Sequence, residues 1–234
     1  TFLPTTVTAT PKEIDAALAR LEESDGINLE GPFLSAEKKG AHAEEKITEV
    51  DVKLLEKHKN QIKITTIAPE VGNNLEKIHT VTQLGIKVSL GHSAADYNTC
   101  RKAFCIGATH VTHIFNAMQP LHHREPGLVG AALENSAVFC EVISDGFHLH
   151  PCIVRTLYQA LGADRMVLIS DAISATGLED GEYTLGGLAV TVQNRQARLA
   201  DGTIAGSTSH LMMMLTNAIA FGIPIEDAVK MATL

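Results

Sequence analysis

Seven short apolar runs rich in Val, Ile and Thr alternate along the chain with longer stretches whose apolar residues recur with helical period. This alternation is typical of repeated βα units that build a parallel sheet. We predict strands near residue 5 and in the runs that end at Glu30, Glu70, His92, His113, Asp145 to His148, and Asp171. Helices are predicted over residues 11–24, 49–58, 73–84, 95–106 and 150–162.

Each of these runs ends in a polar or ionisable residue, and successive ends lie roughly 20 to 40 positions apart, one βα unit each. In a parallel α/β barrel all strands open their carboxyl ends on the same face, so these residues would converge in space. An open doubly wound sheet would also gather them along one edge, but no G-x-G-x-x-G follows a strand here. The fold prediction is therefore an α/β protein with a (β/α)8 barrel of the TIM type.

The predicted barrel is incomplete. Seven strands are one short of a closed barrel, so we expect the first strand to lie upstream of Thr1. The chain begins without Met and stops inside a helical pattern at "KMATL". We expect residues 1–234 to form one barrel domain that is a fragment of a longer chain.

Residues 183–207 depart from the βα pattern, because apolar and polar residues alternate there around Gly, Asn and Asp-Gly turns. This pattern predicts a β-hairpin insertion after the last barrel strand. A helix is predicted over residues 209–221, and its Met212 to Met214 are expected to fill the core.

Composition excludes several classes of partner. Hydrophobic residues make up 45% and charged residues 20%, as in soluble globular proteins, and the formal charge of -8 argues against nucleic-acid binding. No apolar run approaches the ~18 residues of a membrane span, and no signal-peptide pattern is present. The four cysteines have neither paired nor zinc-ribbon spacing, so we expect reduced thiols and a cytoplasmic location.

Glu30, His92 and His113 end three different predicted strands, and their side chains suit a divalent cation such as Zn²⁺ or Fe²⁺. One carboxylate and two imidazoles leave at least one coordination position open, which is the arrangement of a catalytic metal site. From the residues alone, structural interpretations stay open. Glu30 could cap a helix or pair with a lysine, and some of the 11 histidines will fall at strand ends by chance.

Asp171 ends the apolar strand "LISDA" and would reach the same face as the three ligands. There it could deprotonate a water molecule and later protonate a leaving group, although an N-cap or an ion pair is the structural alternative. Asn116, Arg124 and His148, with Asp145, are further polar candidates beyond the strand ends, and His42 follows a glycine turn. Arginine, Asn and His together could hold a phosphate, although loop arginines are more often only solvated.

The motifs occur in an order that resembles one enzyme family. They are "LEGPF", "KKGAH", "GHS", "THIFNAM", "REPG", "DGFH", "SDA" and "AGS". Over essentially the whole chain this order is similar to that of N-acetylglucosamine-6-phosphate deacetylases of the amidohydrolase superfamily. The resemblance implies a (β/α)8 barrel with a small flanking β-domain, most of which would lie outside this sequence.

The resemblance also implies roles for individual residues. Glu30, His92 and His113 would bind the metal, usually zinc or iron, and Asp171 would be the general base and acid. His42 would polarise the acetamide carbonyl, and His148 would contact the sugar. Asn116 and the backbone at Ala117 would meet the phosphate, and Arg124 would reach the same group from the neighbouring subunit of a homodimer.

One residue departs from the family pattern. Asn28 stands where the family usually has His, two residues before Glu30 and thus on the same strand face. This change affects the expected hydrogen bonding near the metal.

Two alternatives to this function stay open. One is another amidohydrolase that acts on a different N-acyl sugar or a cyclic amide, and the other is a non-catalytic phosphosugar-binding barrel.

Overall fold

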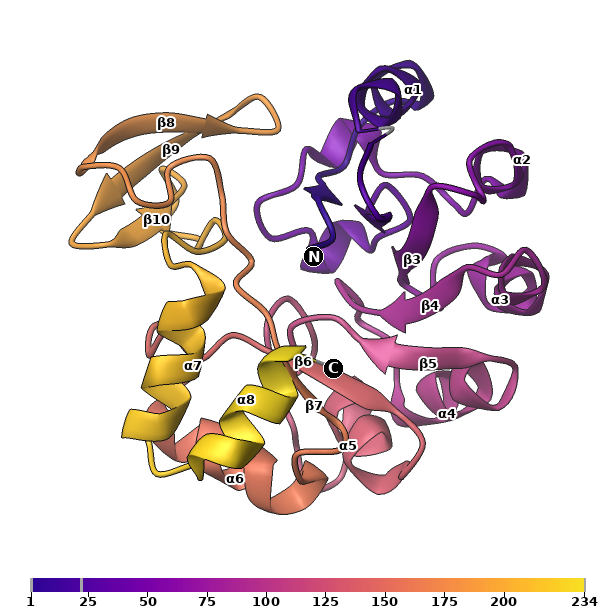
Figure 1. Ribbon diagram of the computed structural model, residues 1–234. Helices are drawn as coiled ribbons and strands as arrows, with labels where there is room; N and C mark the ends of the chain where they lie inside the picture. Colours follow the sequence, from indigo (N-terminus) through magenta and orange to yellow (C-terminus); the bar gives the residue numbers. More distant parts are fainter. Residues whose placement is uncertain (1, 22, 234) are drawn as a thin grey trace.

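A curved, seven-stranded parallel sheet forms the centre of the protein in a computed structural model, which describes residues 2–21 and 23–233. The strands lie side by side in chain order, so each pairs with the strand that follows it in the sequence (Figure 1). Their bounds are β1 (Thr5–Thr6), β2 (Ile27–Glu30), β3 (Ile62–Ile67), β4 (Lys87–Leu90), β5 (Ala108–Val111), β6 (Phe139–Val142) and β7 (Met166–Leu168). All seven predicted strands are therefore present, and β1 and β7 are the two edges of the sheet.

Helices connect successive strands and lie on the outer side of the curved sheet (Figure 1). They are α1 (Pro11–Arg20), α2 (Val52–Lys57), α3 (Asn74–Gln83), α4 (Tyr97–Cys105), α5 (Gly127–Glu134) and α6 (Pro151–Leu161), with two short 3₁₀ turns at Ala36–Lys38 and Glu44–Lys46. The sequence begins α1 sharply, because Thr10 forms a capping box with Glu13 and Pro11 occupies the first turn. None of the described helices is long and apolar enough to cross a membrane.

The helix α5 was not predicted. Its segment "GLVGAALE" contains two glycines and is apolar on most of its faces, so it gives no amphipathic period. Five of its eight residues are buried, and tertiary packing rather than pattern accounts for the helix.

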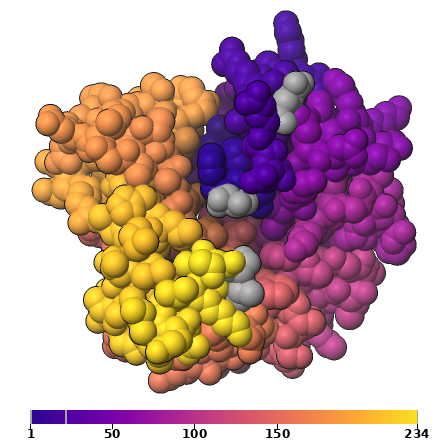
Figure 2. Space-filling view, viewed as in Figure 1, coloured from indigo at the N-terminus to yellow at the C-terminus, as the bar shows by residue number. Residues whose placement is uncertain are grey.

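A separate antiparallel sheet follows β7, with strands β8 (Gly181–Leu185), β9 (Leu188–Gln193) and β10 (Gln196–Arg198). It confirms the hairpin predicted over 183–207 and adds a third strand. Its small apolar core is distinct from that of the barrel wall and includes Val190, Val192 and Ala205. In the space-filling view the orange sheet lies beside the indigo N-terminal segment, where the backbone at Gly186 approaches Val7 (Figure 2).

The chain then forms α7 (Leu211–Ala220) and α8 (Ile225–Thr233), which pack against each other and against β7. The expectation that the three methionines fill the core holds for Met214, which is fully buried, and is wrong for Met212, which is 62% exposed. Successive helical positions point about 100° apart, so three residues in a row cannot all face the same core.

The seven-stranded parallel α/β architecture is thus established, whereas the first barrel strand and the flanking β-domain stay predictions.

Candidate active site

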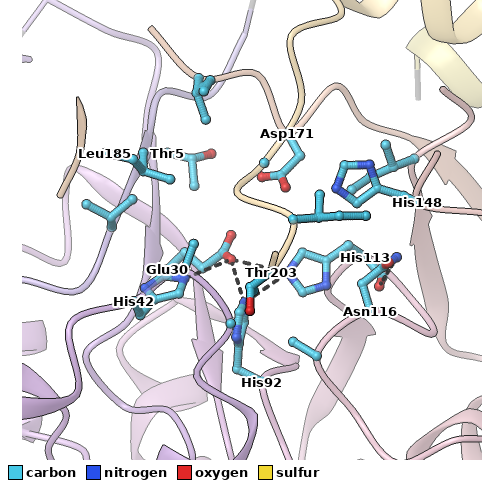
Figure 3. A pocket seen from close by; sticks show the side chains of 18 of the residues that line it. Thr5, Glu30, His42, His92, His113, Asn116, His148, Asp171, Leu185 and Thr203 are labelled. Atoms are coloured by element: carbon cyan, nitrogen blue, oxygen red, sulfur yellow. Dashed lines mark hydrogen bonds and ion pairs between the residues drawn. The ribbon is translucent and has the colours of Figure 1, made fainter. Parts of the chain in front are cut away.

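Four predicted site residues meet where the parallel strands end. Glu30 is the last residue of β2, His92 and His113 follow β4 and β5, and Asp171 follows β7. All four line one cavity of about 350 Å³ at this edge of the sheet (Figure 3). Its wall also includes the predicted substrate residues His42, Asn116, Ala117 and His148.

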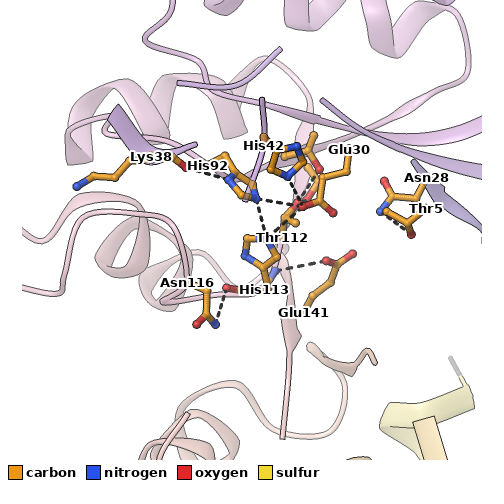
Figure 4. A network of polar contacts seen from close by, with 12 residues as sticks. Thr5, Asn28, Glu30, Lys38, His42, His92, Thr112, His113, Asn116 and Glu141 are labelled. Carbon is orange, nitrogen blue, oxygen red and sulfur yellow. Dashed lines mark hydrogen bonds and ion pairs between the residues drawn. The ribbon is translucent and has the colours of Figure 1, made fainter. Parts of the chain in front are cut away.

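Three side chains converge tightly on one point (Figure 4). Oε1 of Glu30 lies 3.0 Å from Nε2 of His92 and 3.3 Å from Nε2 of His113, and the two imidazole nitrogens are 3.0 Å apart. The three residues are 4–6% exposed. A carboxylate and two imidazoles, buried and aimed at a common centre, form the donor set of a divalent cation with nitrogen and oxygen ligands.

The hydrogen bond on the far side of His92 fixes its tautomer. Nδ1 of His92 lies 2.8 Å from the carbonyl oxygen of Lys38, which only accepts, so Nδ1 carries the proton. Nε2 of His92 therefore presents a lone pair to the Glu30 carboxylate, which also offers a lone pair. Two acceptors this close repel each other unless a positive charge lies near both, so the residues present fit a bound cation.

His42 has the opposite tautomer. Its Nδ1 accepts from the backbone N–H of Thr8 at 3.1 Å, so in the neutral ring Nε2 carries the proton. That Nε2–H lies 3.6 Å from Oε1 of Glu30. Candidate ligand atoms of Glu30, His42 and His92 lie within 4.8 Å of one another, but a protonated Nε2 is a donor and not a ligand. The geometry therefore favours His113 over His42 as the third ligand.

The protein stabilises positive charge at this centre. Burial alone would raise the pKa of Glu30, but hydrogen bonds from His113, His42 and His92 hold it well below its ordinary value. Burial likewise disfavours charge on both rings. It lowers the pKa of His92 to about 4, whereas the Glu30 carboxylate outweighs it at His113 and raises that pKa to about 9.

Asp171 faces this cluster from the opposite wall of the cavity (Figure 3). Burial of its carboxyl group and repulsion from Glu30 raise its pKa above the ordinary value. The backbone at Asp171, His92 and His113 lies in the left-handed region, with φ of 46°, 46° and 27°. Non-glycine residues rarely adopt this conformation outside sites where the surrounding structure enforces it.

The Glu70 side chain stabilises the turn after His92. The Glu70 carboxylate accepts from Ser93 Oγ at 2.7 Å and from the backbone N–H of Ala94 at 2.6 Å. Ser93 in turn donates its N–H to the carbonyl of Ala117 at 3.2 Å. The turn after His92 and the Asn116–Ala117 loop are thus joined through Ser93, whose hydroxyl donates to the Glu70 carboxylate.

The predicted substrate residues divide into two groups. His148 lines the cavity, and its Nδ1 pairs with Asp145 Oδ2 at 2.7 Å, which leaves Nε2 free to face a ligand. Asn116 also lines the cavity, but its Nδ2 donates to the carbonyls of His113 and Ile114 at 3.2 and 3.3 Å. Arg124 does not line the cavity and lies exposed on the loop before α5.

Several contributors to the site were not predicted from the sequence, among them Glu141, Leu185 and Thr203. Glu141 is a buried carboxylate of β6 whose Oε2 accepts from the backbone N–H of His113 at 3.4 Å, and burial raises its pKa to about 7. Its signal was a lone acidic residue inside the apolar run "VFCEVI". Leu185 reaches the cavity from the antiparallel sheet and Thr203 from the loop after β10, and no local pattern indicated this.

No protein-family model matches the sequence. Among curated relatives, the N-acetylglucosamine-6-phosphate deacetylase of Bacillus subtilis is 42% identical over 223 residues, which cover 88% of this chain and 56% of that protein. The enzyme of the same name from Vibrio furnissii is 39% identical, and the match covers 99% of this chain and 62% of that protein. An N-acetylgalactosamine-6-phosphate deacetylase from Escherichia coli O157:H7 is 37% identical over 100% of this chain and 66% of its own length.

Solved structures give the same result. A mutant N-acetyl-D-glucosamine-6-phosphate deacetylase from Mycobacterium smegmatis, in complex with N-acetyl-D-glucosamine-6-phosphate, matches with a TM-score of 0.93 and 37% identity, covering 99% of this chain and 64% of that one. The N-acetylglucosamine-6-phosphate deacetylase of Thermotoga maritima matches with a TM-score of 0.94 and 37% identity, covering 99% of this chain and 66% of that one. The chain therefore spans between about half and two thirds of the proteins it matches. In sequence and in fold it is a homologue of the N-acetylglucosamine-6-phosphate deacetylases along nearly its whole length, as its motifs predicted.

Proposed function

We propose that the protein hydrolyses the acetamide of N-acetylglucosamine 6-phosphate to acetate and glucosamine 6-phosphate. The observation that carries this proposal is the convergence of Glu30, His92 and His113 opposite Asp171 in one cavity. Relatives of that name, and a structural neighbour in complex with N-acetyl-D-glucosamine-6-phosphate, support the choice of substrate.

Glu30, His92 and His113 would hold the divalent cation, with Zn²⁺ the first candidate and Fe²⁺ the second. When bound, such a cation supplies Lewis-acid activation of water at neutral pH. The chain contributes the orientation of the ligands, because the Lys38 carbonyl fixes the His92 ring with its Nε2 toward the centre.

Asp171 would act as general base and then as general acid. Its carboxylate accepts a proton from the attacking water and returns it to the amine nitrogen as the C–N bond breaks. A pKa raised above the ordinary aspartate value makes the carboxylate a stronger base for the first half of this transfer. The neutral acid formed in that half then carries the proton to the leaving nitrogen. The whole step needs one group that faces the reacting atoms, and Asp171 faces the ligand cluster.

The remaining cavity residues would bind and polarise the substrate. His42 presents Nε2–H, held by the Thr8 backbone, to the acyl carbonyl oxygen, where negative charge develops. His148, oriented by Asp145, would contact the sugar. Asn116 and the backbone N–H of Ala117 would meet the phosphate. For Asn116 this requires that its amide release at least one of the two loop carbonyls it now contacts.

Arg124 would complete the phosphate site of a neighbouring subunit in a homodimer. Its guanidinium is exposed and forms no ion pair with another described residue, so it is free to reach outward. A planar guanidinium is suited to bidentate contact with phosphate. A cytoplasmic location, where phosphosugars are metabolised, stays part of this proposal.

The E. coli relative makes N-acetylgalactosamine 6-phosphate a second candidate substrate, which differs from the first only in the configuration at C4. The decisive experiment is acetate release by the metal-reconstituted full-length protein from both 6-phosphates and from unphosphorylated N-acetylglucosamine. We expect the highest kcat/KM with N-acetylglucosamine 6-phosphate. Equal activity without phosphate would favour a different N-acyl substrate, and binding without turnover would favour a non-catalytic barrel.

A further inference from the structure

The segment Ile204–Ser207 joins the antiparallel sheet to the cavity. On one side, Ala205 N–H donates to the carbonyl of Ala197 in β10 at 2.9 Å. On the other side, Ser207 N–H donates to the carbonyl of Asp171 at 2.7 Å, and Ile173 N–H donates to the carbonyl of Ser207 at 2.9 Å. The segment therefore pairs like a short strand with the backbone that carries the proposed base.

Gly206 brings this segment into direct contact with Asp171. A Cβ atom built at Gly206 would lie 3.0 Å from the Asp171 carbonyl oxygen and 2.6 Å from Cγ2 of Ile173. It would also lie 3.7 Å from Oδ2 of Asp171, and Gly206 has a φ of 63°. Only glycine fits here without displacing its neighbours, because both the space and the backbone conformation exclude a side chain.

Asp171 needs such a support. It lies three residues beyond the end of β7, so the sheet ladder no longer holds it, and its φ of 46° is unfavourable for aspartate. Its carboxylate forms no hydrogen bond with any other residue that the structure describes. The direction of this side chain is therefore determined by its backbone, and the backbone is held by Ser207 and Gly206.

We propose that the segment Ile204–Ser207 is a positioning element for Asp171, with Gly206 as its determining residue. The close approach at Gly206 and the paired hydrogen bonds of Ser207 hold the Asp171 backbone in its left-handed conformation, which directs the carboxylate toward Glu30 and His113. The kinetic part of this inference rests on the proposed function, because it assigns Asp171 the role of base.

Gly206→Ala tests the inference, and Gly202→Ala is its matched control. Gly202 lies in the same loop with a φ of 87°, but a Cβ there would meet nothing within 4 Å. Both substitutions therefore impose backbone strain, and only one displaces Asp171. In the metal-loaded full-length protein we expect Gly206→Ala to lower kcat about 10²-fold, with KM and metal content nearly unchanged. Gly202→Ala should keep kcat within about twofold.

A second variant separates positioning from packing. Ile173→Ala, added to Gly206→Ala, removes the Cγ2 atom that the new methyl group would strike. The contact with the Asp171 carbonyl remains, so we expect kcat to stay low. Full recovery of kcat in the double variant would overturn the inference, as would a kcat of Gly206→Ala equal to that of Gly202→Ala.

A structural readout does not depend on turnover. Crystal structures of the two glycine variants should show the Asp171 carboxylate displaced in Gly206→Ala and in place in Gly202→Ala, and an unmoved Asp171 in Gly206→Ala would contradict the inference. If the wild-type protein lacks deacetylase activity, the proposed function fails while this comparison still decides the inference. Should Gly206→Ala not fold, Thr176→Val replaces it, because Thr176 Oγ1 donates to the Ser207 carbonyl at 3.2 Å. We then expect about a threefold loss of kcat, and an unchanged kcat would count against the role of the segment.

Discussion

The two ends of the cavity are built in different ways. At the proposed metal end, Glu30, His92 and His113 are almost fully buried and lie at or just beyond the ends of regular strands. At the proposed phosphate end, Asn116 lies on an irregular loop that continues through the exposed residues 121–125, where Arg124 lies outside the cavity. The same molecule thus places its proposed chemistry on a rigid sheet and its proposed recognition on a loop.

This difference indicates a division of labour. Ligand atoms must meet within a few tenths of an ångström, which packed strand ends with supporting hydrogen bonds provide. Phosphate recognition tolerates more movement, because a guanidinium reaches its partner through a long flexible side chain. Substitutions at the two ends should therefore impair the protein in different ways.

Loss of a ligand should abolish activity. Glu30→Gln removes the one negative charge from the ligand set, so bound metal should fall to a trace and acetate release should become undetectable. Metal analysis of the purified variant measures the bound metal. An acetate-release assay of the variant, beside wild-type protein treated with a chelator, measures the activity. A fully active Glu30→Gln protein would place the metal, and hence the rigid end, elsewhere.

Asp171→Asn should separate chemistry from metal binding. Because the amide cannot accept the proton, we expect kcat to fall by about 10²–10⁴-fold while metal content stays at the wild-type level. Steady-state kinetics and metal analysis on the same preparation measure both quantities. Turnover near that of the wild type would remove Asp171 from the role of base.

Arg124→Ala should affect the flexible end alone. We expect KM for the 6-phosphate to rise about 10- to 100-fold, with metal content and the activity on unphosphorylated substrate unchanged. Mixing Arg124→Ala subunits with Asp171→Asn subunits should restore activity, since a mixed dimer would contain one site with both residues intact. No recovery in a dimer of proven mixed composition would mean that Arg124 acts within its own subunit or not at all.

His110 should add a pH dependence to the rigid end. Burial on β5 lowers its pKa to about 4, and its ring stacks on Phe139 at 5.2 Å. Because the unfolded chain takes up this proton near pH 6.5 and the folded chain only near pH 4, stability should fall as pH drops through this window. In His110→Gln, the loss of unfolding free energy between pH 6.5 and pH 4 should be smaller by about 2 kcal/mol, as measured by denaturant unfolding. A curve of unchanged slope would show that His110 is not the group responsible.

The sequence predicted the rigid end better than the flexible one. Strands and their terminal residues Glu30, His92, His113 and Asp171 follow a regular period that parallel βα units impose, so their convergence could be inferred. The contributions of Leu185 and Thr203 could not be inferred, because they depend on how the antiparallel sheet and the loop after β10 lie against the parallel sheet. Helix α5 was missed for the same reason, since its apolar residues serve tertiary packing and show no period. The position of Arg124 relative to a second subunit is not encoded in any local pattern.

The left-handed backbone at His92, His113 and Asp171 has a consequence for which chemistries this scaffold admits. Among non-glycine residues, histidine, asparagine and aspartate tolerate that bend best, whereas β-branched and bulky residues do not. Glutamate appears instead at position 30, inside a regular strand where φ imposes no such choice. The backbone conformation thus limits which acidic and basic residues these three positions can hold. Few substitutions there could lead to a new reaction.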